Sequence, residues 1–320
     1  MAIPDVKEKW SGRVNTVTIG ATSAEGGTRG RTVTVGGASG IPFLSYDGEM
    51  PHAPVVAMDV LDKQPGEWPQ PLAEVYGDVW SDPAAWAVRV KELGADVVNL
   101  RLISTHPDED DAPPQQAAET VKAVLAAVDL PLIVWGSLVP QKDQRVMPKV
   151  AEACQGENCL LGAVTEEDYR TLTAAAQAYG HKVIALAPCD INKQKQVNIL
   201  VSDMGFPIED VVIYPTTTSL GYGMEYIYSI LERGRLAALS GDKLMAQPVI
   251  LDVGHEAWRA KEARSGDEFA DVWGPAQDRG PAWEAVTACD LLQGGADILI
   301  MRHPKAIEAV RTTVCQLMGG

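Results

Sequence analysis

Polar side chains stand at the carboxyl ends of several apolar runs in this chain, where the strands of a parallel sheet would bring them together. They are carboxylates, amides, hydroxyls, arginines and one histidine: Asp59, Asp62, Asn99, Arg101, Thr105, His106, Ser137, Asp190, Asn192, Thr216, Thr217, Asp252 and Arg302. Metal-assisted hydrolysis calls for clustered histidines with carboxylates, and Schiff-base chemistry calls for a lysine at a strand end. The set contains neither pattern, so it predicts little catalysis by the chain itself.

Three of these residues suggest a more specific chemistry. Asp59, Asn99 and Asp252 could hydrogen-bond the edge of a pterin ring, as polar side chains of barrel methyltransferases do. Buried aspartate and asparagine side chains also commonly satisfy neighbouring backbone groups. One sequence does not separate these two interpretations, and both stay open.

Positioning such residues requires strands whose carboxyl ends converge. Eight short apolar runs recur along the chain, and nearly every gap between them can hold one amphipathic helix. The runs cover residues 55–61, 96–102, 132–135, 159–162, 182–187, 211–214, 249–251 and 297–301. They are rich in Val, Ile and Leu without alternation, which is typical of strands covered on both faces. We therefore predict an α/β fold, a single (β/α)8 TIM barrel whose functional residues lie at the C-terminal ends of its strands.

The N-terminal part follows a different pattern. Residues 14–19 and 31–35 alternate on a period of two, and a glycine-rich loop joins them. This pattern predicts a β-hairpin. We expect residues 1–50 to form an N-terminal β-hairpin extension and residues 51–320 to form the TIM-barrel domain. The hairpin could close the bottom of the barrel or reach out to a partner.

A long polar stretch breaks the regular spacing of the apolar runs between the seventh and the eighth. It covers residues 254–281, and Trp258, Trp273 and Trp283 lie in it or just beyond it. We predict a long insertion between strand 7 and helix 7. Loops of this length are usually functional lids or partner surfaces, and large aromatic side chains suit interfaces. The alternative is that the tryptophans pack the insertion onto the barrel rim.

Composition narrows the class of partner. The chain of 320 residues carries 27 basic and 43 acidic residues, a net charge of −16. This balance argues against nucleic-acid binding, which needs a basic surface. The 5 cysteines show no C-x-x-C spacing, so we predict no metal or iron–sulfur cluster in this chain. No apolar run approaches the roughly 20 residues of a membrane span and no signal-peptide pattern opens the chain, so we expect a cytoplasmic location and no membrane contact.

Several motifs resemble those of one family in the same order along the whole chain. They are Lys-Trp-Ser-Gly at 9–12, Val-Thr-Ile-Gly-Ala-Thr at 17–22, Gly-Gly-Thr-Arg-Gly at 26–30, Thr-Val-Thr-Val-Gly at 32–36, Ser-Thr-His-Pro-Asp at 104–108, Gly-Glu-Asn-Cys at 156–159, Pro-Thr-Thr at 215–217, Leu-Gly-Tyr-Gly at 220–223 and Ile-Leu-Ile-Met-Arg-His-Pro at 298–304. The chain resembles the small (delta) subunit of the corrinoid iron–sulfur protein, part of the acetyl-CoA decarbonylase/synthase complex of the reductive acetyl-CoA pathway. It departs from the family pattern at Tyr214, where an acidic residue is expected, and at Thr218, where a glycine is expected.

The resemblance implies a barrel subunit in a heterodimer. Its larger partner would carry the iron–sulfur cluster and the corrinoid-binding domain, and the corrinoid (cobalamin-type) would lie between that domain and the top of this barrel. Cobalt would accept a methyl group from methyltetrahydrofolate through a separate methyltransferase and deliver it to acetyl-CoA synthase. This chain would hold no metal ligand and no catalytic residue of its own.

Strand-end position alone selects the residues expected to contact the corrinoid, which are Thr105, His106, Asp190, Thr216, Thr217 and Arg302. Two alternatives remain. The chain could be a pterin-dependent TIM-barrel methyltransferase that binds methyltetrahydrofolate directly. It could also be a purely architectural partner that pairs through its hairpin and its tryptophan-bearing insertion.

Overall fold

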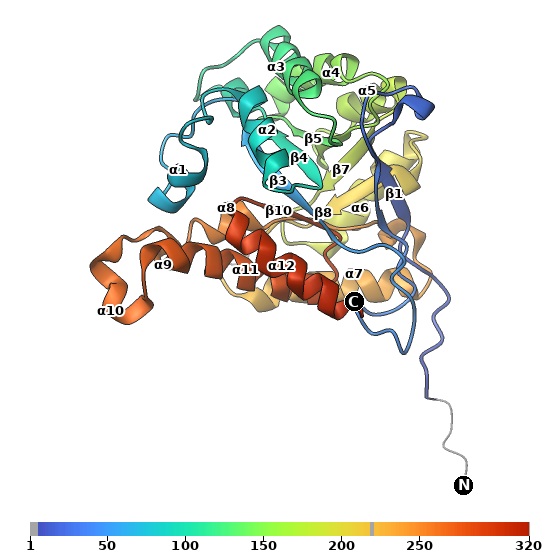
Figure 1. Ribbon diagram of the computed structural model, residues 1–320. Helices are drawn as coiled ribbons and strands as arrows, with labels where there is room; N and C mark the ends of the chain where they lie inside the picture. Colours follow the sequence, from blue (N-terminus) through green and yellow to red (C-terminus); the bar gives the residue numbers. More distant parts are fainter. Residues whose placement is uncertain (1–5, 218–220, 320) are drawn as a thin grey trace.

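The computed structural model describes residues 6–217 and 221–319, and its centre is a ring of eight parallel strands (Figure 1). The strands are β3 (Val55–Leu61), β4 (Val97–Arg101), β5 (Leu132–Trp135), β6 (Leu160–Val164), β7 (Lys182–Leu186), β8 (Val211–Tyr214), β9 (Ile250–Asp252) and β10 (Ile298–Met301). They pair in the order β8-β7-β6-β5-β4-β3-β10-β9, and a bridge between Ile213 and Val249 joins the two ends. The predicted (β/α)8 barrel is confirmed.

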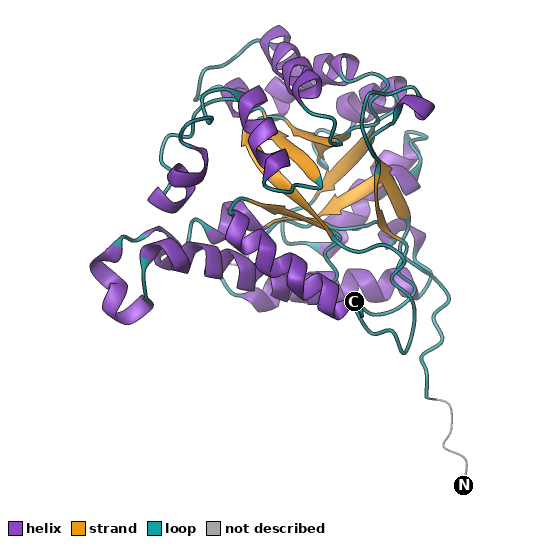
Figure 2. Ribbon diagram, in the orientation of Figure 1, coloured by secondary structure: helices purple, strands orange, loops and turns teal. Residues whose placement is uncertain are grey.

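Helices surround the strands, as Figure 2 shows. They are α1 (Gln70–Tyr76), α2 (Pro83–Glu92), α3 (Pro114–Ala127), α4 (Pro140–Ala153), α5 (Arg170–Tyr179), α6 (Ile191–Asp203), α7 (Met224–Leu239), α8 (Val253–Ala257), α9 (Lys261–Arg264), α10 (Ala270–Trp273), α11 (Ala276–Gly294) and α12 (Pro304–Leu317). The side chains of Asp82 and Asp190 accept hydrogen bonds from backbone N–H groups in the first turns of α2 and α6. Such N-caps satisfy donors that a helix leaves without partners, so they set where each helix begins at the end of its loop.

The two N-terminal strands close the bottom of the barrel. β1 (Thr16–Ile19) and β2 (Val33–Gly36) pair in antiparallel register and form the predicted hairpin. Val17 and Ile19 are buried in the same apolar cluster as the barrel strands. Of the two placements left open by the sequence, the structure has the hairpin cover the N-terminal ends of the barrel strands. The domain boundary at residue 50 stays a prediction.

A buried arginine fastens the hairpin loop to the barrel. The side chain of Arg29 is 2% exposed, and its Nε lies 2.8 Å from a carboxylate oxygen of Glu157. Its Nη1 donates to the carbonyl oxygens of Val128 and Leu130 at 2.6 and 3.2 Å. These acceptors lie before β5 and β6, so the glycine-rich loop is anchored to the barrel bottom.

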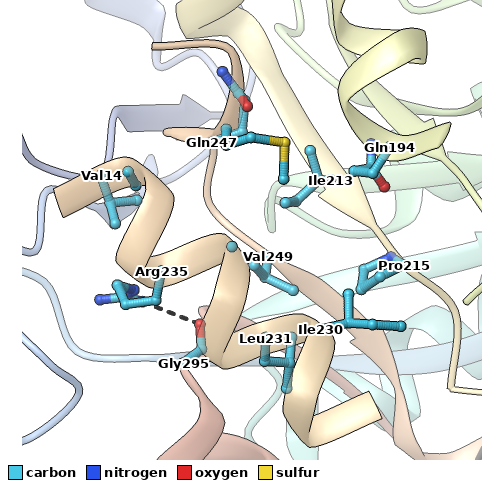
Figure 3. A pocket seen from close by; sticks show the side chains of 13 residues that line it. Val14, Gln194, Ile213, Pro215, Ile230, Leu231, Arg235, Gln247, Val249 and Gly295 are labelled. Carbon is cyan, nitrogen blue, oxygen red and sulfur yellow. Dashed lines mark hydrogen bonds between the residues drawn. The ribbon is translucent and has the colours of Figure 1, made fainter. Parts of the chain in front are cut away.

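The barrel wall is joined least firmly between β8 and β9, where the single Ile213–Val249 bridge replaces a longer ladder. We call this junction the seam. A narrow cavity of about 20 Å³ lies beside it under α7, lined by Ile213, Val249 and Leu231 among others (Figure 3). Arg235 of α7 lies at the edge of this cavity and donates to the carbonyl oxygen of Gly295 at 3.1 Å.

The insertion between strand 7 and helix 7 is present as predicted. It runs from β9 through α8, α9 and α10 to α11, and α10 lies far from the barrel axis in Figure 1. Trp258 is buried at the barrel rim, whereas Trp283 on α11 is 44% exposed. The packing interpretation therefore holds for Trp258, whereas the interface interpretation stays a prediction for Trp283.

Within residues 6–217 and 221–319, no helix has the length and apolar character needed to cross a membrane. Thr218, one of the two departures from the family pattern, and Leu220 of the Leu-Gly-Tyr-Gly motif lie outside the described residues.

Candidate functional site

An open cleft of about 660 Å³ lies at the C-terminal ends of the strands. Trp68, Trp135 and Trp258 contribute aromatic walls, and Arg101 and Arg302 contribute the polar floor. Trp68 comes from the connection between β3 and α1, whereas Trp258 follows α8 in the insertion. Elements distant in sequence thus build this cleft, which we call the mouth of the barrel.

Asp59 is the centre of the polar floor. It lies on β3 and its side chain is fully buried. Its Oδ1 accepts from Nδ2 of Asn99 at 2.7 Å and from Nε of Arg101 at 2.8 Å. Its Oδ2 accepts from Nε of Arg302 at 2.8 Å. Three strands are therefore tied together by one carboxylate.

These partners keep Asp59 ionised. Burial by itself would raise the pKa of its carboxyl, because a charged group loses solvation inside a protein. The charges and hydrogen bonds of Arg101 and Arg302 outweigh burial and hold the pKa at about 2. A carboxylate fixed in this way is a poor general base, since its proton affinity is far below what proton abstraction near neutral pH requires.

Arg101 links Asp59 to a second carboxylate across the mouth. Its Nη2 lies 2.6 Å from Oδ2 of Asp252 on β9. Burial would lower the pKa of Arg101, but Asp252 and Asp59 outweigh burial and raise it. Asn99 completes the arrangement, because its amide oxygen accepts from Nε1 of Trp135 at 2.7 Å. We call Asp59, Asn99, Arg101, Asp252 and Arg302 the floor network.

Aromatic rings cover both arginines. The guanidinium carbon of Arg302 lies 4.9 Å from the ring centre of Trp68, and that of Arg101 lies 5.6 Å from the ring centre of Trp135. Tyr214 packs edge-on against Trp135 at 5.4 Å between ring centres. A cation over an aromatic face is stabilised by the ring quadrupole, more strongly where water is excluded. The floor is therefore rigid as well as charge-balanced.

Glu284 of α11 holds the insertion and the end of β10 together beneath the cleft. Its Oε1 accepts from the backbone N–H of Arg302 at 2.5 Å, and its Oε2 accepts from Nε1 of Trp258 at 2.8 Å and the N–H of His303 at 3.0 Å. Burial raises the pKa of Glu284 to about 7, against the opposing effect of these hydrogen bonds. The position of Trp258 over the mouth thus depends on a carboxyl that titrates near neutral pH.

Two of the six residues expected to contact a ligand line the cleft. They are Arg302, whose side chain is 8% exposed, and His106 at the rim. Nδ1 of His106 accepts from the backbone N–H of Asp108 at 3.1 Å, which orients the ring.

Two others, Thr105 and Thr217, are fully buried and engaged within the protein. The hydroxyl of Thr105 donates to the carbonyl oxygen of Leu102 at 2.6 Å, and that of Thr217 donates to the carbonyl oxygen of Asp252 at 2.8 Å. Neither residue lines the cleft. Their hydroxyls support the loops beneath it.

The remaining two lie on the rim after β7 and β8. Asp190 caps α6, and the hydroxyl of Thr216 lies 3.4 Å from the thiol sulfur of Cys189. Thr216, Cys189 and Leu138 all have a positive φ, at 63°, 51° and 63°. Residues other than glycine adopt this conformation only where their surroundings enforce it. Three strand ends of the mouth are therefore held in fixed, unfavourable backbone conformations.

Sequence reasoning did not select Trp68 or Glu284. Trp68 carries a weak signal, because it lies in a proline-rich connection directly after a strand end. Glu284 carries none, because a glutamate within a helix is most often exposed to solvent. Arg101 stands among the strand-end residues, but the sequence does not indicate that it bridges two carboxylates.

Within the two described ranges, no group of three or more His, Cys, Asp or Glu side chains is placed to hold a metal ion.

The sequence matches one family over most of its length. Residues 16–314 match the model described as CO dehydrogenase/acetyl-CoA synthase delta subunit. The chain is 40% identical over 320 residues to the acetyl-CoA decarbonylase/synthase complex subunit delta of Archaeoglobus fulgidus, covering 98% of this chain and 70% of that protein. It is 43% identical over 301 residues to the protein of the same description from Methanopyrus kandleri, covering 93% of this chain and 74% of that protein.

Solved structures of dihydropteroate synthases are similar in fold. The enzyme from Coxiella burnetii in complex with pteroic acid superposes with a TM-score of 0.58 at 13% identity, covering 94% of this chain and 99% of that one. The Xanthomonas albilineans enzyme superposes with a TM-score of 0.57 at 15% identity, covering 87% of this chain and 98% of that one. At such identity the likeness shows the barrel fold alone.

Proposed function

The chain belongs to the CO dehydrogenase/acetyl-CoA synthase delta subunit family, and from that premise we propose that it is the small subunit of a heterodimeric corrinoid methyl carrier. A larger subunit would hold the iron–sulfur cluster and the corrinoid-binding domain. The mouth of this barrel would cover one face of the corrinoid. The corrinoid supplies the cobalt that carries a methyl group from methyltetrahydrofolate, through a separate methyltransferase, to acetyl-CoA synthase.

The observation that carries this proposal is that both carboxylates of the floor network are ion-paired. Asp59 and Asp252, the carboxylates that could act as bases, form ion pairs with Arg101 and Arg302. A site for proton transfer or nucleophilic attack would instead present such a group free and near its working pKa. The geometry favours a surface that binds and shields over one that reacts.

The cleft suits one face of a corrinoid. Three tryptophans line it, of which Trp135 and Trp258 are buried and Trp68 is partly exposed. Trp68 therefore offers the aromatic face that a macrocycle could contact. The strained rim residues and the ion-paired floor hold this surface in one shape. Closing an apolar surface over a reactive centre excludes water and prevents side reactions. In this proposal the barrel contributes shape and dryness.

Titration of a corrinoid into the purified chain, with and without the larger subunit, tests the proposal. We expect the isolated chain to bind hydroxocobalamin weakly and the heterodimer to hold its corrinoid tightly, as followed in the visible spectrum. The accessibility of cobalt to small ligands such as cyanide should fall when this chain joins the loaded larger subunit. Full corrinoid affinity in the isolated chain, or unchanged cyanide access in the heterodimer, would contradict the proposal.

One observation favours the alternative of direct pterin binding. Asp59 and Asn99 lie side by side on β3 and β4, and Nδ2 of Asn99 donates to Oδ1 of Asp59 at 2.7 Å. However, Arg101 and Arg302 already engage Asp59, and Trp135 engages the amide oxygen of Asn99. A pterin would have to displace these partners. Calorimetric titration with methyltetrahydrofolate decides: binding by the isolated chain that is lost in Asn99→Ala would support this alternative, and no binding would remove it.

A further inference from the structure

The floor of the mouth carries hydrogen-bond donors that the protein leaves unengaged. Arg302 uses Nε for Asp59, and Arg101 uses Nε and Nη2 for Asp59 and Asp252. Among residues 6–217 and 221–319, no atom accepts a hydrogen bond from either Nη of Arg302 or from Nη1 of Arg101. These nitrogens have no partner in this part of the chain but are not buried, and both side chains line the cleft. They are therefore open to whatever enters it.

The acceptors of the same floor are already occupied. Asp59 accepts three hydrogen bonds, from Asn99, Arg101 and Arg302. Asp252 accepts from Arg101 and, at 3.3 Å, from the backbone N–H of His255. A ligand edge made of N–H donors, such as that of a pterin, would find few free oxygens. A ligand edge that presents oxygen acceptors would find several free N–H groups.

Charge decides which kind of acceptor fits. The two carboxylates and two guanidinium groups of the floor network cancel formally. At the rim, Arg259 pairs with Glu256 at 3.4 Å and Arg264 pairs with Glu67 at 3.5 Å. The cleft thus offers donors without excess positive charge. An oxyanion would gain little Coulomb attraction to offset the loss of its hydration, whereas a neutral carbonyl oxygen loses far less on leaving water.

We propose that Arg101 and Arg302 form a subsite for neutral carbonyl oxygens, of the kind that primary carboxamides present. This inference rests on the proposed function, since a corrinoid carries primary carboxamides around its macrocycle. A free oxyanion such as inorganic phosphate offers acceptor oxygens too, and the test below separates these two sources.

The variant Arg302→Lys isolates the unengaged donors. A lysine keeps the positive charge and can pair with Asp59, but its single ammonium group replaces a fork with two free Nη groups. The readout is the affinity of this chain for the larger subunit, measured with the corrinoid-loaded and the corrinoid-free form. The ratio of the two affinities reports what the corrinoid adds.

We expect Arg302→Lys to reduce that ratio about tenfold or more, because hydrogen bonds from charged donors are among the strong ones. The affinity for the corrinoid-free partner should stay unchanged. Arg101→Lys should act in the same direction and serves if Arg302→Lys lowers the melting temperature. Arg259→Lys is the matched control, because that side chain lines the same cleft but is 60% exposed and pairs with Glu256.

An unchanged ratio in both lysine variants would overturn the subsite, as would an equal loss of affinity for the loaded and the empty partner. Inorganic phosphate provides the second arm. Millimolar phosphate that binds the isolated chain, and no longer binds Arg302→Lys, would assign the donors to an oxyanion instead. If the corrinoid adds no affinity in the unsubstituted chain, the proposed function itself fails, and that outcome is distinct from a failure of the subsite.

Discussion

Asp59 is the residue on which most of the barrel mouth depends. Its replacement by alanine would leave Arg302 without its ion pair and Arg101 with only one, both largely buried. Removing one partner of a buried pair costs about 3–5 kcal/mol, because an uncompensated charge stays behind. We expect Asp59→Ala to lower the free energy of unfolding by that amount in urea denaturation at pH 7.

Asp78→Ala is the matched control for this loss. Asp78 also pairs with an arginine, Arg89 at 2.7 Å, but its side chain is 65% exposed. Exposed pairs contribute at most about 1 kcal/mol. Equal losses in the two variants would show that Asp59 has no special structural role.

The contribution of Asp59 to stability should also depend on pH. Because the pKa of Asp59 is lowered from 3.8 to about 2, its contribution is present above pH 4 and disappears as the pH falls through 2.

Glu284 should make stability depend on pH in the opposite direction. Its pKa is raised from 4.5 to about 7 in the folded chain. Between these values the folded state holds a proton that the unfolded state has lost, so stability falls as pH rises from about 4.5 to about 7. The fall should be on the order of 3 kcal/mol, from about 1.4 kcal/mol per pKa unit. Unfolding free energies at pH 5 and pH 8 measure it, and Glu284→Gln should remove it.

Two tryptophan variants test which contacts set the pKa of Glu284. Trp258→Phe removes a hydrogen bond to the Glu284 carboxylate, which should move the fall in stability to higher pH. Trp283→Phe alters an exposed ring on α11 that forms no hydrogen bond to Glu284 among the described residues, and should leave the fall in stability at the same pH. A pH dependence that persists in Glu284→Gln would assign the titration to another group.

At the scale of elements, the hairpin functions as part of the barrel. Its buried face joins the apolar cluster of the barrel strands, whereas Thr18 and Thr34, which share a hydrogen bond at 3.0 Å, are only partly buried. An interface that used the hairpin alone would have to rely on this threonine face. Deleting the hairpin would therefore disturb the fold before it tested any pairing.

Arg29→Met tests the anchor of the hairpin more cleanly than a deletion. The change removes the hydrogen bonds to the barrel bottom and leaves Glu157 buried without its cation. We expect a loss of about 3–5 kcal/mol and faster proteolysis in the loop at residues 20–30. Arg31→Met is the control from the same hairpin, because Arg31 is 50% exposed and lies 3.5 Å from Asp96. It should cost at most about 1 kcal/mol, and a comparable loss in both would contradict the anchor.

At the scale of the whole molecule, the barrel fold could be predicted from the sequence, because the apolar runs recur at a regular spacing along the chain. Strands such as 55–61 are covered on both faces, so their composition alone indicates a parallel sheet. Contacts made by long side chains have no such period. Arg101 extends from β4 to Asp252 on β9, and Glu284 faces inward from the middle of a helix. Their partners lie 151 and 18 residues away in sequence, so no local pattern indicates them. Strand-end position likewise does not indicate that Thr105 and Thr217 are fully buried, with their hydroxyls bound to backbone carbonyl oxygens.

The seam between β8 and β9 should be where the barrel opens first. The Ile213–Val249 bridge joins these strands, and the hydroxyl of Thr217 reinforces them at the mouth by donating to the carbonyl oxygen of Asp252. Local opening has a lower free energy where fewer contacts must break. In hydrogen exchange, the amide of Ile213, which donates to the carbonyl oxygen of Pro248 at 2.9 Å, should therefore exchange faster than the amides of β3 and β4.

Thr217→Val should widen this difference, because it removes a hydrogen bond that crosses the seam and leaves a carbonyl oxygen without that donor. Thr105→Val is the matched control. Both threonines are fully buried, but the hydroxyl of Thr105 donates to Leu102, three residues away in its own loop. Thr217→Val should lose about 1–3 kcal/mol of global stability, and Thr105→Val should lose less, because the carbonyl oxygen of Leu102 still accepts from the backbone N–H of Thr105 at 3.2 Å. Only Thr217→Val should speed exchange at Ile213 beyond that global effect, and equal acceleration in the two variants would mean that the barrel opens as a whole and not at the seam.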